Sequence, residues 1–183
     1  MQESLGENPE LAARVAGIRL LLLDVDGVMT DGSIVFADDG TEWKRFHVRD
    51  GTGIKLWRLA GHQAAILSGR NSATTSRRAA ELGITLVVQG QEDTSAGLAA
   101  ILAQCGVVAA EVCAIGDDLA DLPVFQQVGV RVAVADACPE LLSRADYQTR
   151  ELGGHGAVRA AIEWLLKGQG RWESLLERYR VCG

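Results

Sequence analysis

Five short apolar runs recur along the chain, at residues 19–24, 64–67, 85–88, 112–115 and 131–134. None of them alternates strictly between apolar and polar side chains, which is typical of strands buried on both faces of a parallel sheet. Between and after these runs lie segments with the periodicity of amphipathic helices, at residues 53–60, 72–82, 95–105, 119–128 and 157–166. This alternation predicts an α/β fold with a doubly wound, mostly parallel sheet.

One segment interrupts the alternation. Residues 33–37 and 41–48 are predicted strands joined at Asp38-Asp39-Gly40, which indicates a protruding β-hairpin. The expected organisation is an N-terminal extension (1–17), a domain (18–167, hairpin about 33–48) and a C-terminal tail (168–183).

The tail has an apolar pattern of its own. Its larger apolar side chains have helical spacing, which predicts a stripe that docks on the domain: Trp172, Leu175, Leu176 and Tyr179.

The charge pattern limits the classes of partner. The net charge is −6 and there is no basic run, which argues against nucleic acid as the main partner.

The densest apolar run, at residues 18–23, is too short to span a membrane. The N-terminal region carries Glu3, Glu7 and Glu10 and lacks the pattern of a signal peptide, so a cytoplasmic location is expected.

The first apolar run leads directly into Asp24-Val25-Asp26-Gly27. Ligands of open α/β sheets bind beyond the carboxyl ends of the strands, where these carboxylates are expected. One carboxylate of such a pair can act as nucleophile while the other acts as general acid and base. A surface turn is the alternative, because Asp and Gly are common in turns.

Two later strands also end in polar residues. Ser68-Gly69-Arg70 offers a hydroxyl, a closely approaching backbone and a cation for phosphate oxygens, with a helix N-terminus after it. Gly116-Asp117-Asp118, followed by Asp121, offers the oxygen ligands that Mg²⁺ prefers. Helix capping is the alternative for each segment alone, but three such segments at three strand ends favour one active site.

At this point the chain resembles a known family. Residues 24–26, Ser68 and residues 116–118 resemble motifs I, II and IV of the haloacid-dehalogenase superfamily, which has a Rossmann-like core. Seven segments, in order, resemble phosphatases that act on 3-deoxy-D-manno-octulosonate 8-phosphate (KDO 8-phosphate): 24–32, 46–51, 68–70, 89–91, 116–121, 133–137 and 153–158.

The resemblance implies a phosphatase without a cap domain that forms a homotetramer through the hairpin, in lipopolysaccharide biosynthesis. It implies that Asp24 is the nucleophile, that Asp26 is the general acid and base, and that Ser68 binds the phosphate. The Mg²⁺ ligands would be Asp24, Asp117 and the backbone carbonyl of Asp26, with Asp118 and Asp121 in support.

The resemblance also implies contacts with a phosphosugar substrate. Arg70 can grip a sugar-acid carboxylate with its guanidinium fork. Related phosphatases that act on KDN 9-phosphate typically carry Glu after the motif II glycine, so Arg70 favours KDO 8-phosphate. The other expected substrate contacts are Asp26, His47, Val48, Arg49, Asp50, Gly51, Lys55, Gly69, Arg78 and Thr94.

Thr94 departs from the family pattern, because the family has a lysine there that steadies the nucleophile and the phosphate. Losing one charge-stabilising donor typically lowers a rate by about 10²–10³-fold. Lys44, Lys55 and Arg49 are the candidate substitutes. A KDO 8-phosphate phosphatase with reduced activity is therefore predicted; the alternatives are a phosphatase for a related substrate such as KDN 9-phosphate and a pseudo-phosphatase oligomerisation module.

Overall fold

The computed structural model describes residues 8–179 and contains a parallel sheet of six strands. The strands lie in the order β5-β4-β1-β6-β7-β8. Their bounds are β1 (Leu20–Leu23), β4 (Gln63–Ser68), β5 (Leu86–Gln89), β6 (Val112–Gly116), β7 (Val130–Ala133) and β8 (Tyr147–Gln148). The five predicted strands are confirmed, and β8 is an additional edge strand that the sequence did not indicate.

Strand β1 occupies the middle of the sheet because its four leucines are buried on both faces. Leu23 pairs with Ile66 of β4 on one side and with Ile115 of β6 on the other. From β1 the chain first builds β4 and β5, and then crosses back to build β6 and β7. The direction of winding therefore changes beside β1, and the crevice at such a point is where this class of sheet binds ligands.

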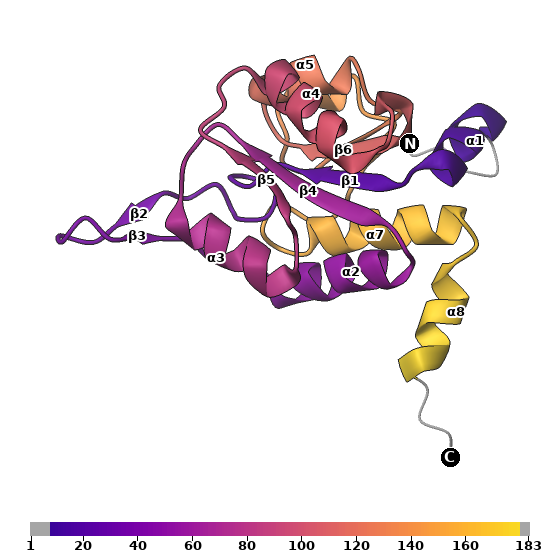
Figure 1. Ribbon diagram of the computed structural model, residues 1–183, viewed down its shortest axis with the longest axis horizontal. Helices are drawn as coiled ribbons and strands as arrows, with labels where there is room; N and C mark the ends of the chain where they lie inside the picture. Colours follow the sequence, from indigo (N-terminus) through magenta and orange to yellow (C-terminus); the bar gives the residue numbers. More distant parts are fainter. Residues whose placement is uncertain (1–7, 180–183) are drawn as a thin grey trace.

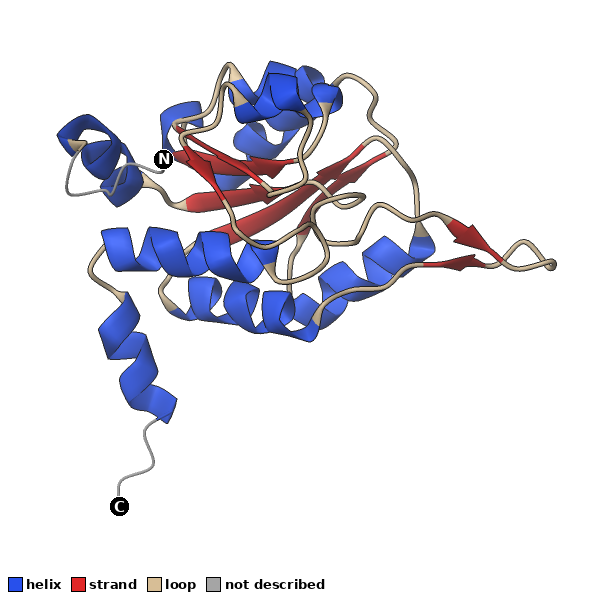
Figure 2. Ribbon diagram, turned by 180° about the vertical axis from the view of Figure 1, so that it is seen from behind, coloured by secondary structure: helices blue, strands red, loops and turns tan. Residues whose placement is uncertain are grey.

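Helices cover both faces of the sheet (Figures 1 and 2). In Figure 1, α2, α3 and α7 lie below the sheet, and α4 and α5 lie above it. The α-helices are α1 (Pro9–Gly17), α2 (Val48–Leu59), α3 (Ala73–Leu82), α4 (Thr94–Cys105), α5 (Leu122–Phe125), α6 (Pro139–Leu142), α7 (Ala157–Gly168) and α8 (Trp172–Leu176). Three short 3-10 segments are Ala109–Glu111, Leu119–Asp121 and Glu177–Tyr179.

The hairpin prediction is confirmed, with shorter strands than expected. Strands β2 (Val35–Phe36) and β3 (Glu42–Trp43) pair antiparallel and project from the body of the molecule (Figure 1). The second predicted strand, 41–48, ends early because α2 begins at Val48, five residues before the predicted helix at 53–60. The segment from His47 to Gly51 therefore forms the N-cap and first turn of α2.

The helix predicted at 119–128 is also shorter. Asp118 and Asp121 accept hydrogen bonds from the backbone of their own loop, which stabilises a tight 3-10 turn at Leu119–Asp121 before α5. Helix α5 ends at Phe125, and β7 begins at Val130.

Both ends of the described chain pack on the domain. Helix α1, within the predicted N-terminal extension, buries Leu11 and Val15 in the core. In the tail, Trp172 and Leu175 are buried, whereas Tyr179 is exposed. The predicted apolar stripe is thus present over α8 but does not reach Tyr179. No helix among residues 8–179 is long and apolar enough to cross a lipid bilayer.

Candidate active site

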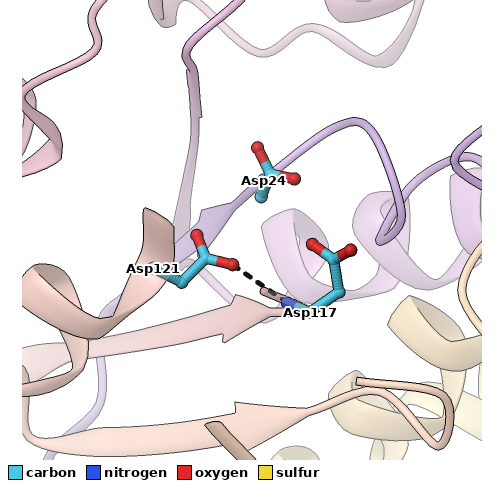
Figure 3. Close-up of side chains that lie close together, drawn as sticks. All are labelled: Asp24, Asp117 and Asp121. Carbon is cyan, nitrogen blue, oxygen red and sulfur yellow. Dashed lines mark hydrogen bonds between the residues drawn. The ribbon is translucent and has the colours of Figure 1, made fainter. Parts of the chain in front are cut away.

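The acidic residues predicted at the strand ends come together at the centre of the sheet. Asp24 follows β1, and Asp117 follows the neighbouring strand β6. One carboxylate oxygen from each of Asp24, Asp117 and Asp121 lies within 4.8 Å of the others (Figure 3). This spacing suits three ligands of one metal ion, and the oxygen donors suit Mg²⁺.

Asp121 also shapes the loop that carries Asp117. Its Oδ2 accepts hydrogen bonds from the backbone N–H groups of Asp117, at 2.9 Å, and of Asp118, at 3.4 Å. Figure 3 shows the Asp117 bond as a dashed line. The sequence predicted Asp121 only as a supporting residue, and the structure makes it a candidate ligand as well.

Gly27 gives Asp117 the space that it occupies. The backbone of Gly27 has φ +100°, and a Cβ atom at this position would lie 2.0 Å from Asp117 Oδ2. A larger residue would combine backbone strain with a collision against the candidate metal ligand. The glycine of the Asp-x-Asp-Gly sequence is therefore required by the geometry of the site.

The three clustered carboxylates repel one another in a poorly solvated place. Burial raises the pKa of Asp24 well above its usual range, and Asp121 and Asp117 raise it further. Burial and the neighbouring carboxylate of Asp121 raise the pKa of Asp117 to about 7. Burial raises the pKa of Asp121 to about 6. A divalent cation would relieve this repulsion, so the donor set fits the predicted Mg²⁺.

A cavity of about 390 Å³ opens beside the cluster. Residues from the ends of β1, β4, β5 and β6 line it: Asp24, Asp26, Leu67, Gly69, Gln91, Glu92, Thr94, Asp117, Asp118, Ala120 and Asp121. It thus unites Asp24, Asp26, Gly69, Thr94 and Asp117 of the predicted site. Its size and its carboxylates suit a small polar substrate bound through a metal ion.

Asp26 is held by a cation from the hairpin. Lys44 Nζ forms an ion pair with Asp26 Oδ1, and only 1% of the Lys44 side chain is exposed. Asp26 Oδ2 is buried and has no hydrogen-bond partner among the described residues. One carboxylate oxygen is thus held by Lys44, while the other makes no hydrogen bond within residues 8–179 and lies 3.7 Å from Arg70 Nε.

Ser68 and Arg70 lie at the end of β4. Ser68 is the buried last residue of the strand, and its Oγ accepts a hydrogen bond of 3.3 Å from the backbone N–H of Arg70. The guanidinium of Arg70 extends toward Asp26 and the hairpin residue Glu42. Ser72 caps α3 by accepting a hydrogen bond from the backbone N–H of Thr75.

Thr94 lies in the cavity wall at the start of α4, and only 7% of its surface is exposed. Its hydroxyl donates a hydrogen bond of 2.8 Å to the carbonyl of Ala120. Thr94 therefore ties α4 to the loop after β6 and brings no positive charge. Lys44 is the candidate substitute that the structure places on an active-site carboxylate.

The predicted residues of the His47–Gly51 segment do not line the cavity. Val48 and Arg49 are exposed. Asp50 is buried and accepts a hydrogen bond of 2.8 Å from the backbone N–H of Arg159, so it joins α2 to the start of α7. Gly51 lets Arg78 approach, because a Cβ there would lie 2.5 Å from the Arg78 guanidinium. Substrate contact by these residues remains a prediction.

Arg78 and Lys55 also lie outside the cavity lining. Arg78 donates to Glu81 at 2.9 Å, and its guanidinium carbon lies 5.6 Å from the centre of the Phe46 ring. Lys55 is exposed on α2. Within one chain, the predicted substrate residues therefore form an inner group in the cavity and an outer group around the start of α2. Arg70 belongs to neither group: it is not in the cavity lining but lies 3.7 Å from the lining residue Asp26.

Glu42 is the functional candidate that the sequence did not indicate. Its carboxylate contacts Arg70 and accepts a hydrogen bond from Ser72 Oγ. It lies in a hairpin strand, far along the chain from both partners, and an isolated Glu there carries no recognisable signal. Gln91 and Glu92 in the cavity wall were likewise not predicted as site residues.

Comparison with known proteins agrees with this geometry. Residues 93–160 match the family model described as haloacid dehalogenase-like hydrolase. The chain is 44% identical over 162 residues to 3-deoxy-D-manno-octulosonate 8-phosphate phosphatase of Escherichia coli K12, an alignment that covers 88% of this chain and 86% of the relative.

Solved structures give the same result. The phosphatase of that name from Yersinia pestis superposes with a TM-score of 0.87 and 46% identity, over 90% of this chain and 89% of the other. The one from Moraxella catarrhalis, in complex with magnesium, phosphate and KDO, has a TM-score of 0.91 and 36% identity, over 94% and 99% of the two chains. The chain belongs to the 3-deoxy-D-manno-octulosonate 8-phosphate phosphatase family of haloacid dehalogenase-like hydrolases.

Proposed function

We propose that this protein is a Mg²⁺-dependent phosphatase that hydrolyses KDO 8-phosphate to KDO and phosphate. The observation that carries the proposal is the position of Asp24, at the end of β1, between the carboxylates of Asp117 and Asp121 and in the same cavity as Asp26. Family membership supplies the substrate, since relatives at 44% identity act on this sugar-acid phosphate by name.

In the first step, a carboxylate oxygen of Asp24 forms a bond to phosphorus. The bond from phosphorus to the sugar oxygen breaks, and Asp26 gives that oxygen a proton, so that KDO leaves as an alcohol. Asp24 then carries the phosphoryl group as an acyl phosphate. A covalent intermediate of this kind divides one difficult displacement into two easier ones.

In the second step, Asp26 takes a proton from a water molecule as the water oxygen bonds to phosphorus. The bond between phosphorus and the Asp24 oxygen breaks, and phosphate is released with Asp24 restored. Asp24, Asp117 and the backbone carbonyl of Asp26 would hold Mg²⁺, which would supply positive charge that offsets repulsion between the carboxylate and the phosphate. Asp121 is available as a further ligand because its oxygen lies in the same cluster.

The remaining predicted residues bind the substrate. Ser68 and the backbone at Gly69 would hold phosphate oxygens, and Arg70 would hold the carboxylate of the sugar acid. Thr94 would contact the substrate from the cavity wall. The outer group around the start of α2, with Lys55 and Arg78, would contact the substrate in an active site that a neighbouring subunit of the tetramer completes.

The homotetramer is part of the same proposal. The hairpin exposes a set of large apolar side chains, from 47% for Ile34 to 65% for Trp43, with Val35 and Phe36 between these values. Such a patch on a projecting element is typical of a protein–protein contact. The release of free KDO would place the enzyme in lipopolysaccharide biosynthesis, as the resemblance implies.

No described contact favours a different sugar acid. Lys55 and His155, which stand where the resembled family commonly has arginine and which motivate the alternative of a different sugar phosphate, lie outside the cavity lining. His155 instead contacts the carbonyl of Gly153 through Nδ1 at 2.7 Å.

Phosphate release from KDO 8-phosphate tests the proposal. We expect wild-type activity that requires Mg²⁺, and a loss of roughly 10³-fold or more in Asp24→Asn, because the amide cannot serve as the nucleophile. Glu140→Gln, which removes an exposed carboxylate on α6, is the control and should keep wild-type activity. Equal activity of Asp24→Asn and wild type would disprove the proposed role of Asp24, and no activity in either protein would favour a non-enzymatic function.

A further inference from the structure

Four charged side chains form a closed ring at the base of the hairpin. Lys44 Nζ contacts Asp26 Oδ1 and lies 3.7 Å from Glu42 Oε1. Arg70 Nη2 lies 3.2 Å from the same Glu42 oxygen, and Arg70 Nε lies 3.7 Å from Asp26 Oδ2. Two carboxylates and two cations thus alternate around the ring and connect the ends of β1 and β4 to strand β3.

The members of the ring differ in exposure. The side chains of Glu42 and Asp26 are 16% and 17% exposed, whereas that of Arg70 is 43% exposed. Charges shielded from water interact more strongly than surface pairs do. Arg70 is therefore the open member of the ring and the one that a dissolved anion can reach.

Glu42 is anchored independently of the ring. Ser72 Oγ, at the buried N-cap of α3, donates a hydrogen bond to Glu42 Oε2. Thr74 Oγ1 donates a hydrogen bond of 3.4 Å to the backbone carbonyl of Glu42. The Glu42 carboxylate therefore has a fixed place on α3 from which it can direct the guanidinium of Arg70.

We propose that Glu42 is a positioning residue that orients the Arg70 guanidinium toward the carboxylate of the substrate and so determines selection for sugar-acid phosphates. An arginine carries five N–H donors in one plane. Glu42 accepts a hydrogen bond from Nη2 and so holds one side of that plane, whereas Asp26 Oδ2 lies 3.7 Å from Nε without a hydrogen bond. The exposed part of the fork can donate to a further carboxylate. The inference rests on the proposed function and adds to it a residue outside the predicted site.

The test compares two phosphate esters. KDO 8-phosphate carries a carboxylate, and p-nitrophenyl phosphate does not. We expect Glu42→Ala to raise the KM for KDO 8-phosphate about tenfold, since a hydrogen bond to a charged group is lost. Glu42→Gln should raise it less, and kcat/KM for p-nitrophenyl phosphate should stay within about twofold of wild type in both variants. Retained hydrolysis of p-nitrophenyl phosphate also shows that each variant is folded.

Two controls make the result specific. Glu163→Gln removes ion pairs to Lys167, at 2.7 Å, and Arg159, at 3.6 Å, on α7, and should change neither substrate's kinetics. In an Arg70→Ala background, Glu42→Ala should have no further effect on the KM for KDO 8-phosphate, because the group that Glu42 orients is absent.

Three outcomes would overturn the inference. An equal loss for both substrates would make Glu42 a purely structural residue. A lower KM for KDO 8-phosphate would mean that Glu42 competes with the substrate for Arg70. An unchanged effect in the Arg70→Ala background would show that Glu42 does not act through Arg70. Wild-type turnover is measured first: its absence with KDO 8-phosphate alone would instead disprove the proposed substrate, on which the inference rests.

Discussion

At the scale of single residues, a positive charge beside the active site comes from the hairpin residue Lys44 and not from the position of Thr94. The resemblance implies a lysine at the position of Thr94, whose hydroxyl here donates a hydrogen bond to the Ala120 carbonyl. Lys44, from the hairpin, instead forms an ion pair with Asp26 in a nearly solvent-free place. The cation is thus paired with the proposed acid and base, and Thr94 brings no positive charge to its side of the cavity.

This difference predicts the effect of Thr94→Lys. Thr94 lines the cavity that also contains Asp24, so a lysine there could reach the nucleophile and a bound phosphate. We expect kcat to rise by up to about 10²-fold, in line with the usual effect of one charge-stabilising donor. Initial rates at saturating KDO 8-phosphate would measure the change.

The matched control is Ala96→Lys, which places the same charge on an exposed position of α4. It should leave kcat unchanged. If Thr94→Lys gave no gain while the protein remained folded, the loss of the family lysine would not be a catalytic deficit in this chain.

At the scale of elements, the hairpin contributes to two separate places. Its base supplies Lys44 and Glu42 to the active site, and Arg45 at the same base forms an ion pair with Asp31. Its outer part exposes Phe36 and Trp43 to solvent in the single chain. One short element therefore carries both active-site charges and the surface that we propose for assembly.

The assembly can be tested on the outer part alone. We expect the double substitution Phe36→Ser and Trp43→Ser to convert a tetramer into smaller species, because the apolar contact area is lost. Light scattering coupled to size-exclusion chromatography would measure the mass. Val108→Ser, which removes an apolar side chain exposed to 63% elsewhere on the surface, is the control. A wild-type protein that is monomeric at micromolar concentration would contradict the proposed tetramer.

At the scale of the whole molecule, the acidic cluster couples folding to protons and to metal. Burial and mutual repulsion raise the pKa of Asp117 to about 7, and burial raises that of Asp121 to about 6, both from an ordinary value of 3.8. The folded, metal-free protein therefore binds protons more tightly than the unfolded chain between about pH 4 and pH 7. The stabilisation that these carboxyl groups contribute is fully present below pH 4 and is lost as the pH rises through 7.

Thermal unfolding with and without Mg²⁺ would measure this coupling. Without metal, we expect the cluster to lower the Tm as the pH rises from 5 to 8. Mg²⁺ should raise the Tm more at pH 8 than at pH 5, because it binds the charged carboxylates. In Asp117→Asn both the pH dependence and the Mg²⁺ effect should be smaller. An equal Mg²⁺ effect at pH 5 and pH 8 would argue against metal binding by this cluster.

The sequence alone determined the sheet and the position of Asp24, the proposed nucleophile. Runs such as Leu20–Leu23 are apolar on every residue, and only a strand covered on both faces buries them completely. The polar residues that follow such strands must lie at the same edge of a parallel sheet. For that reason Asp24, Ser68 and Asp117 could be assigned to one edge before any tertiary contact was known.

The tertiary structure alone decided which side chains of the hairpin and of α3 surround Asp26 and Arg70. Lys44 and Asp26 are 18 residues apart in sequence, and Glu42 and Ser72 are 30 apart. Such pairs meet only because the base of the hairpin lies beside the ends of β1 and β4, which no local pattern encodes. Asp50 shows the same limit, since its hydrogen-bond partner Arg159 lies 109 residues away. Local periodicity determines which helix or strand a residue belongs to, whereas long-range packing determines which side chains it contacts.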